Sequence, residues 1–147
     1  MNILAPVSSI MTYNPLTVDV QDSLRVVDQI FKEKRIHHIP VTKDGELVGM
    51  ISKSDFLFFK RGFSTDSLSK ELEEVRLHSY KAQDIMTKGL AKMESDEKIN
   101  VALEIFKENL FHAIPIVEGK KLVGILTTYD IIKSLADDKG AIASYNR

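Results

Sequence analysis

The chain contains no cysteine. Disulfide bonds, catalysis by a thiolate and zinc sites built on cysteine are therefore excluded. No apolar run approaches the roughly 18 residues that a membrane-spanning helix needs. No cationic segment precedes an apolar one at the N-terminus, so we expect no signal peptide either. A cytoplasmic protein that does not contact a membrane fits these absences best.

An excess of charge of one sign is also missing. The 147 residues include 20 Lys and Arg and 21 Asp and Glu, which gives a formal net charge of −1. We therefore expect no nucleic-acid-binding face built on bulk positive charge. Hydrophobic residues make up 44% of the chain and charged residues 28%. This balance is typical of a folded domain and excludes a disordered chain.

One sequence unit occurs twice, with a constant offset of 75 residues. Residues 10–57 and 85–132 share 15 identities in 48 positions without a gap, whereas unrelated segments would share about three. The repeated motifs are Ile-Met-Thr, Ile-Phe-Lys-Glu, Ile-Pro, Leu-Val-Gly and a final Asp. We infer an internal duplication.

Each copy predicts the element order β-α-β-β-α, which belongs to the α+β class. In the first copy, an extended stretch at 15–18 precedes a helix with an apolar face at helical spacing, formed by Leu24, Val27, Ile30 and Phe31. A strand at 36–42, an Asp44-Gly45 hairpin turn, a return strand at 47–51 and a helix at 56–60 follow. We assign the first repeat to residues 8–62, a partly helical linker to 63–82 and the second repeat to 83–137.

The linker carries Leu68, Leu72 and Val75 in a charged background. Their spacing of four and three residues predicts a short amphipathic helix. Such a helix either lies on the surface of the module or binds a partner.

Both return strands end in the pattern Gly, two apolar residues, Ser or Thr, two variable residues and Asp. Ser52 and Asp55 occupy the polar positions in the first copy, and Thr127 and Asp130 occupy them in the second. The pattern also fits a capping box, in which the hydroxyl and the acid satisfy free amides of the first helical turn. The functional alternative is a carboxylate that accepts hydrogen bonds from two ribose hydroxyls, as acids do in dinucleotide-binding folds.

Three of the four histidines precede the Ile-Pro motifs, at His37, His38 and His112. A half-buried, hydrogen-bonded histidine is one interpretation, and a phosphate contact is the other. Adjacent strand residues point to opposite faces, so we do not expect a metal cluster here. Lys53 is close in sequence and adds positive charge for a phosphate group.

The duplicated unit, with its opening Ile-Met-Thr and its closing Ser/Thr-x-x-Asp, resembles a pair of cystathionine-β-synthase (CBS) domains, often called a Bateman module. The resemblance covers residues 8–136. It implies two CBS repeats packed with pseudo-twofold symmetry and two clefts between them. Such clefts bind AMP, ADP or ATP or, in some members, S-adenosylmethionine.

The resemblance also implies roles for individual residues. The ribose would be held by Ser52, Asp55, Thr127 and Asp130, and the phosphates by His37, His38, His112 and Lys53. The base would lie against Pro15, Leu16, Thr17 and Val18 in one cleft and against Leu90, Ala91, Lys92 and Met93 in the other. The second copy has Ala113 where the first has His38, so the clefts should differ in affinity.

We expect a stand-alone, non-catalytic regulatory module, because few residues flank the two repeats and no P-loop or nucleophile-elbow motif is present. Nucleotide binding would be read by an unidentified protein partner. The alternatives are an interaction module with empty clefts and a sensor of S-adenosylmethionine. We also expect a homodimer, because the apolar runs 56–59 and 131–135 exceed one helix face.

Overall fold

The computed structural model describes residues 1–62, 69–109 and 111–138. The chain forms two compact units. The central unit is Leu16–Leu90, and the terminal unit combines Met1–Pro15 with the described residues from Ala91 onward. Among the residues described, no helix is long and apolar enough to cross a lipid bilayer.

The predicted α+β order is confirmed in both copies. The central unit contains β2 (Val18–Asp19), α1 (Leu24–Glu33), β3 (His38–Lys43), β4 (Glu46–Ser52), α2 (Lys53–Arg61), α3 (Ser69–Ser79) and α4 (Ala82–Ile85). The terminal unit contains η1 (Val7–Ser9), β1 (Thr12–Tyr13), β5 (Met93–Glu94), α5 (Ile99–Asn109), β6 (Ala113–Glu118), β7 (Lys121–Thr127) and α6 (Thr128–Ala136).

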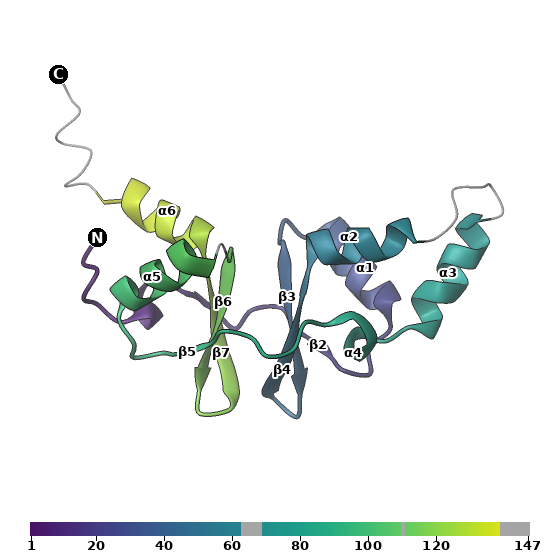
Figure 1. Ribbon diagram of the computed structural model, residues 1–147, viewed down its shortest axis with the longest axis horizontal. Coiled ribbons are helices and arrows are strands. Elements are labelled where there is room, and N and C mark those ends of the chain that lie inside the picture. The colour runs from purple at the N-terminus through teal and green to yellow at the C-terminus, as the bar shows by residue number, and fades with distance from the viewer. Residues whose placement is uncertain (63–68, 110, 139–147) are drawn as a thin grey trace, which may run out of the picture. The chain divides into compact units, whose positions relative to one another are not determined.

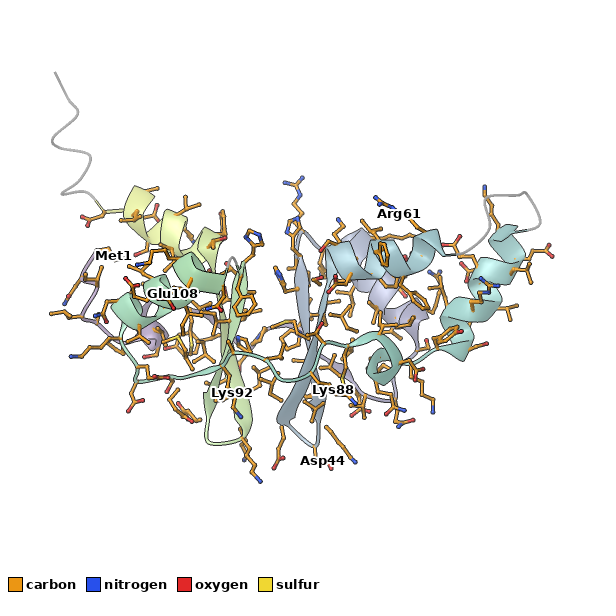
Figure 2. All side chains as sticks on the ribbon, viewed as in Figure 1. Met1, Asp44, Arg61, Lys88, Lys92 and Glu108 are labelled. Atoms are coloured by element: carbon orange, nitrogen blue, oxygen red, sulfur yellow. The ribbon has the colours of Figure 1, made fainter. Side chains whose placement is uncertain are left out.

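The two copies build their strands in the same way. β2 pairs parallel with β3, and β3 pairs antiparallel with β4. β5, β6 and β7 repeat this pattern. The predicted hairpin turn is confirmed, because Asp44 and Gly45 both have positive φ, at 53° and 79°, as a two-residue turn of this type requires. Asp44 lies at the tip of the β3–β4 hairpin, at the other end of the strands from Ser52 (Figure 2).

The first helix of each copy buries most of its apolar face, although Ile30, predicted as part of that face in α1, is only half-buried. In α1, Leu24, Val27 and Phe31 are buried, and the Phe31 ring lies 5.6 Å from that of Phe56 in α2. Figure 1 shows α1 and α2 next to each other beside β3 and β4. In α5, the equivalent buried residues are Ile99, Ala102 and Phe106. Each unit thus has its own hydrophobic core.

Each unit also takes in the opening segment of the other repeat. In the terminal unit, β1 pairs antiparallel with β7, with Thr12 opposite Ile125. In the central unit, Thr87 exchanges two main-chain hydrogen bonds with Met50, of 2.8 and 3.1 Å. The compact units are therefore not the two sequence repeats, because their opening Ile-Met-Thr segments are exchanged.

A methionine packs onto a strand glycine at each exchanged segment. A Cβ added to Gly124 would meet Met11 Sδ at 2.5 Å and the Thr12 carbonyl at 3.0 Å. A Cβ added to Gly49 would meet Met86 Sδ at 2.5 Å. Only glycine leaves room for these contacts, which explains why the Leu-Val-Gly motif recurs.

An ion network fixes the helices of the central unit. Asp28 is only 2% exposed, and its carboxylate pairs with Lys32 at 2.9 Å, Lys60 at 3.1 Å and Arg25 at 3.2 Å. Lys60 also pairs with Glu73 of α3 at 3.0 Å. Burial raises the pKa of Asp28, but hydrogen bonds and charge from Lys32 and Lys60 outweigh it, so the pKa lies below its ordinary value. The network joins α1, α2 and α3.

The linker helix differs from its predicted apolar face. α3 exists, but Leu72 and Val75 are 54% and 60% exposed, and Leu68 lies outside the described residues. Leu77 is the buried residue instead, at 1% exposure. Ion pairs to Glu73 and Glu74 hold the helix, and apolar spacing alone could not reveal them.

The apolar runs that suggested a homodimer divide between core and surface. Phe56 and Ile131 belong to the cores, and Phe59 packs edge-on against Tyr80 at 5.3 Å. The exposed members are Leu57, Phe58, Ile132 and Leu135. The homodimer stays a prediction that involves this smaller set.

We predict that Gly124→Ala lowers the free energy of unfolding by about 1–3 kcal/mol, because overpacking displaces Met11 and strains β1 against β7. Urea unfolding followed by circular dichroism measures the change. Gly62→Ala is the control, since Gly62 is exposed and has an ordinary φ of −68°; it should stay within about 0.5 kcal/mol. Equal stability of the two variants would contradict the packing argument.

We predict that Asp28→Asn lowers the free energy of unfolding at pH 7 by about 1–3 kcal/mol, because three cations lose the negative charge that they share. The pKa of Asp28 is lower in the folded state than its ordinary value of 3.8. The stabilisation is therefore present above about pH 4 and is lost as pH falls through the folded pKa. Urea titrations at pH 7 and pH 3 should show that the difference in free energy of unfolding between the wild type and Asp28→Asn is smaller at pH 3. The same difference at both pH values would contradict the lowered pKa of Asp28. Asp44→Asn, on an exposed turn, serves as the control.

Candidate functional site

The two strand-to-helix junctions, β4 to α2 and β7 to α6, carry the candidate ribose residues. Ser52 and Thr127 are the N-cap residues of α2 and α6. Each hydroxyl accepts a hydrogen bond from the amide of the acid three residues later, at 3.1 Å from Asp55 and 3.2 Å from Asp130. The capping role of both hydroxyls is therefore present in the structure.

The two acids differ in what their carboxylates do. Asp130 Oδ2 accepts hydrogen bonds from Thr127 N at 2.7 Å and Thr127 Oγ1 at 2.8 Å, which completes a capping box. Asp130 Oδ1 accepts a further bond from Thr12 Oγ1 at 3.1 Å. Within the described part of the chain, no donor of this kind reaches the Asp55 carboxylate, and Asp55 is exposed. The capping interpretation thus accounts for the Asp130 carboxylate, whereas the Asp55 carboxylate accepts no hydrogen bond from the described residues.

The candidate phosphate residues lie at the same junctions. His38 is the strand partner of Ser52, and the Lys53 amide donates to the His37 carbonyl at 2.8 Å. In the other copy, the Thr128 amide donates to the His112 carbonyl at 3.1 Å. His37 and His112 are exposed and His38 is half-buried. The structure therefore places the main chain of these histidines beside the strand-to-helix junctions that carry the acids of their own copy.

The candidate base residues divide into side chains that can face a ligand and side chains that cannot. Val18 and Met93 are each 1% exposed and belong to the hydrophobic cores, so only their main chain could contact a base. Leu16, Thr17 and Lys92 are exposed, while Pro15, Leu90 and Ala91 are half-buried. Lys92 lies within the second of these stretches, and Lys88 precedes it by two residues (Figure 2).

Pro15 belongs to the unit that contains Asp130, and Leu90 to the unit that contains Asp55. The other candidate base residues share a unit with the acid of their own copy: Leu16, Thr17 and Val18 with Asp55, and Ala91, Lys92 and Met93 with Asp130.

The terminal unit contains a pocket of about 470 Å³ beside Asp130. It lies between Ser9–Thr12 and one side of α6, and Lys133 and Asp137 also line it. This volume is within the range of small-molecule pockets. Sequence reasoning missed the pocket and the Thr12 contact, although the recurrence of Ile-Met-Thr in both copies marked this segment.

Comparisons with known proteins agree on one family. The model of that family, described as "CBS domain", matches residues 7–62 and 82–137. Two uncharacterized proteins of Methanocaldococcus jannaschii, MJ1404 and MJ1232, are each 31% identical to this chain, over 140 and 121 residues. The matches cover 92% and 82% of this chain but only 33% and 36% of those proteins. The chain thus spans about a third of the length of these curated relatives.

Solved structures share the fold. The crystal structure of CBSX2 in complex with AMP is 25% identical in sequence and has a TM-score of 0.74. The likeness covers 90% of this chain and 96% of that chain. A CBS domain of a membrane protein from Sphaerobacter thermophilus is also 25% identical, with a TM-score of 0.76 over 89% of this chain and 88% of that one.

The unequal caps give a stability prediction. Asp130→Ala should lower the free energy of unfolding by about 1 kcal/mol, because the Thr127 amide loses its acceptor. Asp55→Ala removes no such bond and should change stability by less than about 0.5 kcal/mol. Thermal and urea unfolding of both variants measure the difference. Equal losses would mean that Asp55 also caps its helix.

Proposed function

Because the chain belongs to the CBS domain family, we propose that it is a non-catalytic regulatory module that binds an adenine nucleotide and transmits its presence to a partner protein. The observation that carries the proposal is the likeness to CBSX2, whose structure holds AMP. The local geometry of the two junctions supports it. Two alternatives are tested below. In one, the module binds S-adenosylmethionine; in the other, it binds no nucleotide and acts only through protein contacts.

The Asp55 junction suits a ribose. Its carboxylate is exposed, and the Ser52 hydroxyl beside it already orients the first turn of α2. Two vicinal hydroxyls can donate to one carboxylate, and such charge-assisted bonds are stronger than bonds between neutral groups. In this proposal Asp55 and Ser52 hold the ribose in one site, and Asp130 and Thr127 hold it in the other.

The same junction suits phosphate. His37, His38 and Lys53 offer three side chains that can donate to a phosphate oxygen, and the start of α2 contributes its positive dipole end. The second copy offers His112 but has Ala113 and Thr128 in place of His38 and Lys53. We propose that the Asp55 site binds the more highly charged nucleotide.

The base would be held by Pro15–Val18 and Leu90–Met93, the two stretches in which the chain passes from one unit to the other. Their exposed or half-buried apolar members supply a flat contact, and the main chain of Val18 and Met93 supplies hydrogen-bond groups. Nucleotide binding there would change the conformation of these connecting stretches. A partner protein would read that change.

We predict that the protein binds AMP and that Asp55→Asn weakens this binding tenfold to a hundredfold in one site, since the lost charge-assisted bonds are worth about 1.5–3 kcal/mol. Isothermal titration calorimetry with AMP, ADP, ATP, adenosine and S-adenosylmethionine measures the affinities. Chromatography of the recovered nucleotide should show it unchanged.

Asp44→Asn is the matched control for this measurement. It removes the same charge from the same unit at the far end of the strands and should leave AMP affinity unaltered. Absence of binding by AMP, ADP and ATP at millimolar concentration would overturn the proposal. Tighter binding of S-adenosylmethionine than of AMP, ADP and ATP would show that the proposed ligand is wrong.

A further inference from the structure

The hydrogen bond between Thr12 and Asp130 distinguishes the two junctions. Asp130 Oδ2 is committed to the cap of α6, so Oδ1 is the oxygen best placed to receive a ligand hydroxyl. Thr12 Oγ1 already donates to Oδ1 at 3.1 Å. A ribose that uses this carboxylate must therefore displace Thr12 or share the oxygen with it.

The strand pairing of β1 holds Thr12 in this position. Thr12 lies opposite Ile125 in the β1–β7 pair, and Met11 before it is 7% exposed and packs onto Gly124. The main chain is thus anchored on both sides of the hydroxyl. A fixed donor competes with a ligand more strongly than a mobile side chain would, because little entropy is regained on its release.

The central unit has the same segment without the same bond. Thr87 is anchored to Met50 by two main-chain hydrogen bonds, as Thr12 is anchored to β7. In the described residues of that unit, the Asp55 carboxylate nevertheless receives no hydrogen bond from Thr87. The two copies therefore differ in one contact made by an identical residue.

We propose that the Thr12 hydroxyl is a built-in competitor for the ribose at Asp130 and sets a lower nucleotide affinity there than at Asp55. The inference rests on the proposed function. In this inference Thr12 sets the affinity of the Asp130 site through the carboxylate, without contacting the nucleotide itself. Thr12 and Asp130 both line the 470 Å³ pocket, so an arriving ligand can reach the bond. Occupancy of this site would release the hydroxyl of a residue in the opening segment of the other repeat.

The test uses the full chain with Asp55→Asn, which isolates the Asp130 site. Thr12→Val in this background removes the competing hydroxyl and keeps the side-chain shape. AMP affinity, measured by calorimetry, should rise about threefold to tenfold, the range expected for one hydrogen bond. Thr12→Ser keeps the hydroxyl and should match the parent. Thr12→Ala provides a second variant without the hydroxyl if the valine disturbs folding, which circular dichroism checks.

Two controls separate competition from a structural effect. The first is 2′,3′-dideoxy-AMP, which lacks both ribose hydroxyls and should bind equally to the parent and to Thr12→Val. The second is Thr87→Val in an Asp130→Asn background, which should leave AMP affinity at the Asp55 site unchanged. A gain that persists with the dideoxy ligand would contradict competition at the carboxylate.

Unchanged or weaker AMP binding by both Thr12→Val and Thr12→Ala would overturn the inference while leaving the proposed function intact. Failure of the wild-type chain to bind any adenine nucleotide would overturn both. The two failures are thus distinguishable.

Discussion

The strand arrangement of each unit depends on a methionine that packs onto a strand glycine. Met11 occupies the space above Gly124, and Met86 occupies the space above Gly49. These contacts hold the segments that pair with β7 and β4, and they bring threonines to the strands that lead into α6 and α2. The geometry of both junctions follows from this exchange, because a segment of one repeat completes the strand arrangement of the unit that carries the other acid.

The central unit adds a second constraint. The buried carboxylate of Asp28 forms ion pairs with lysines of α1 and α2, and Lys60 of α2 also pairs with Glu73 of α3. α2 is the helix that starts at the Asp55 junction, and through Lys60 in its last turn this network joins it to α1 and α3. The linker helix is thereby tied to the helix that begins at the candidate site.

Features determined by short segments could be predicted from the sequence. The duplication, the β-α-β-β-α order, the Asp44-Gly45 turn and the caps at Ser52 and Thr127 each depend on a few neighbouring residues. Contacts between distant residues could not be predicted. Thr12 and Asp130 are 118 positions apart. The two acids share one motif, but among the residues that the structure describes only the Asp130 carboxylate accepts hydrogen bonds. Leu77 was missed because charge pairs, rather than apolar spacing, orient α3.

The exchange of segments also imposes an order on folding. Leu16–Leu90 is a continuous stretch and holds all the strands of its unit. The terminal unit is split, and β1 must wait for β7, which is made more than a hundred residues later. The entropy cost of closing a loop grows with the length of free chain between its ends. Prior folding of the central unit replaces that free chain with a compact body. The ribosome synthesises the N-terminal part of the chain first. The central unit can therefore fold before the second segment of the terminal unit has been made.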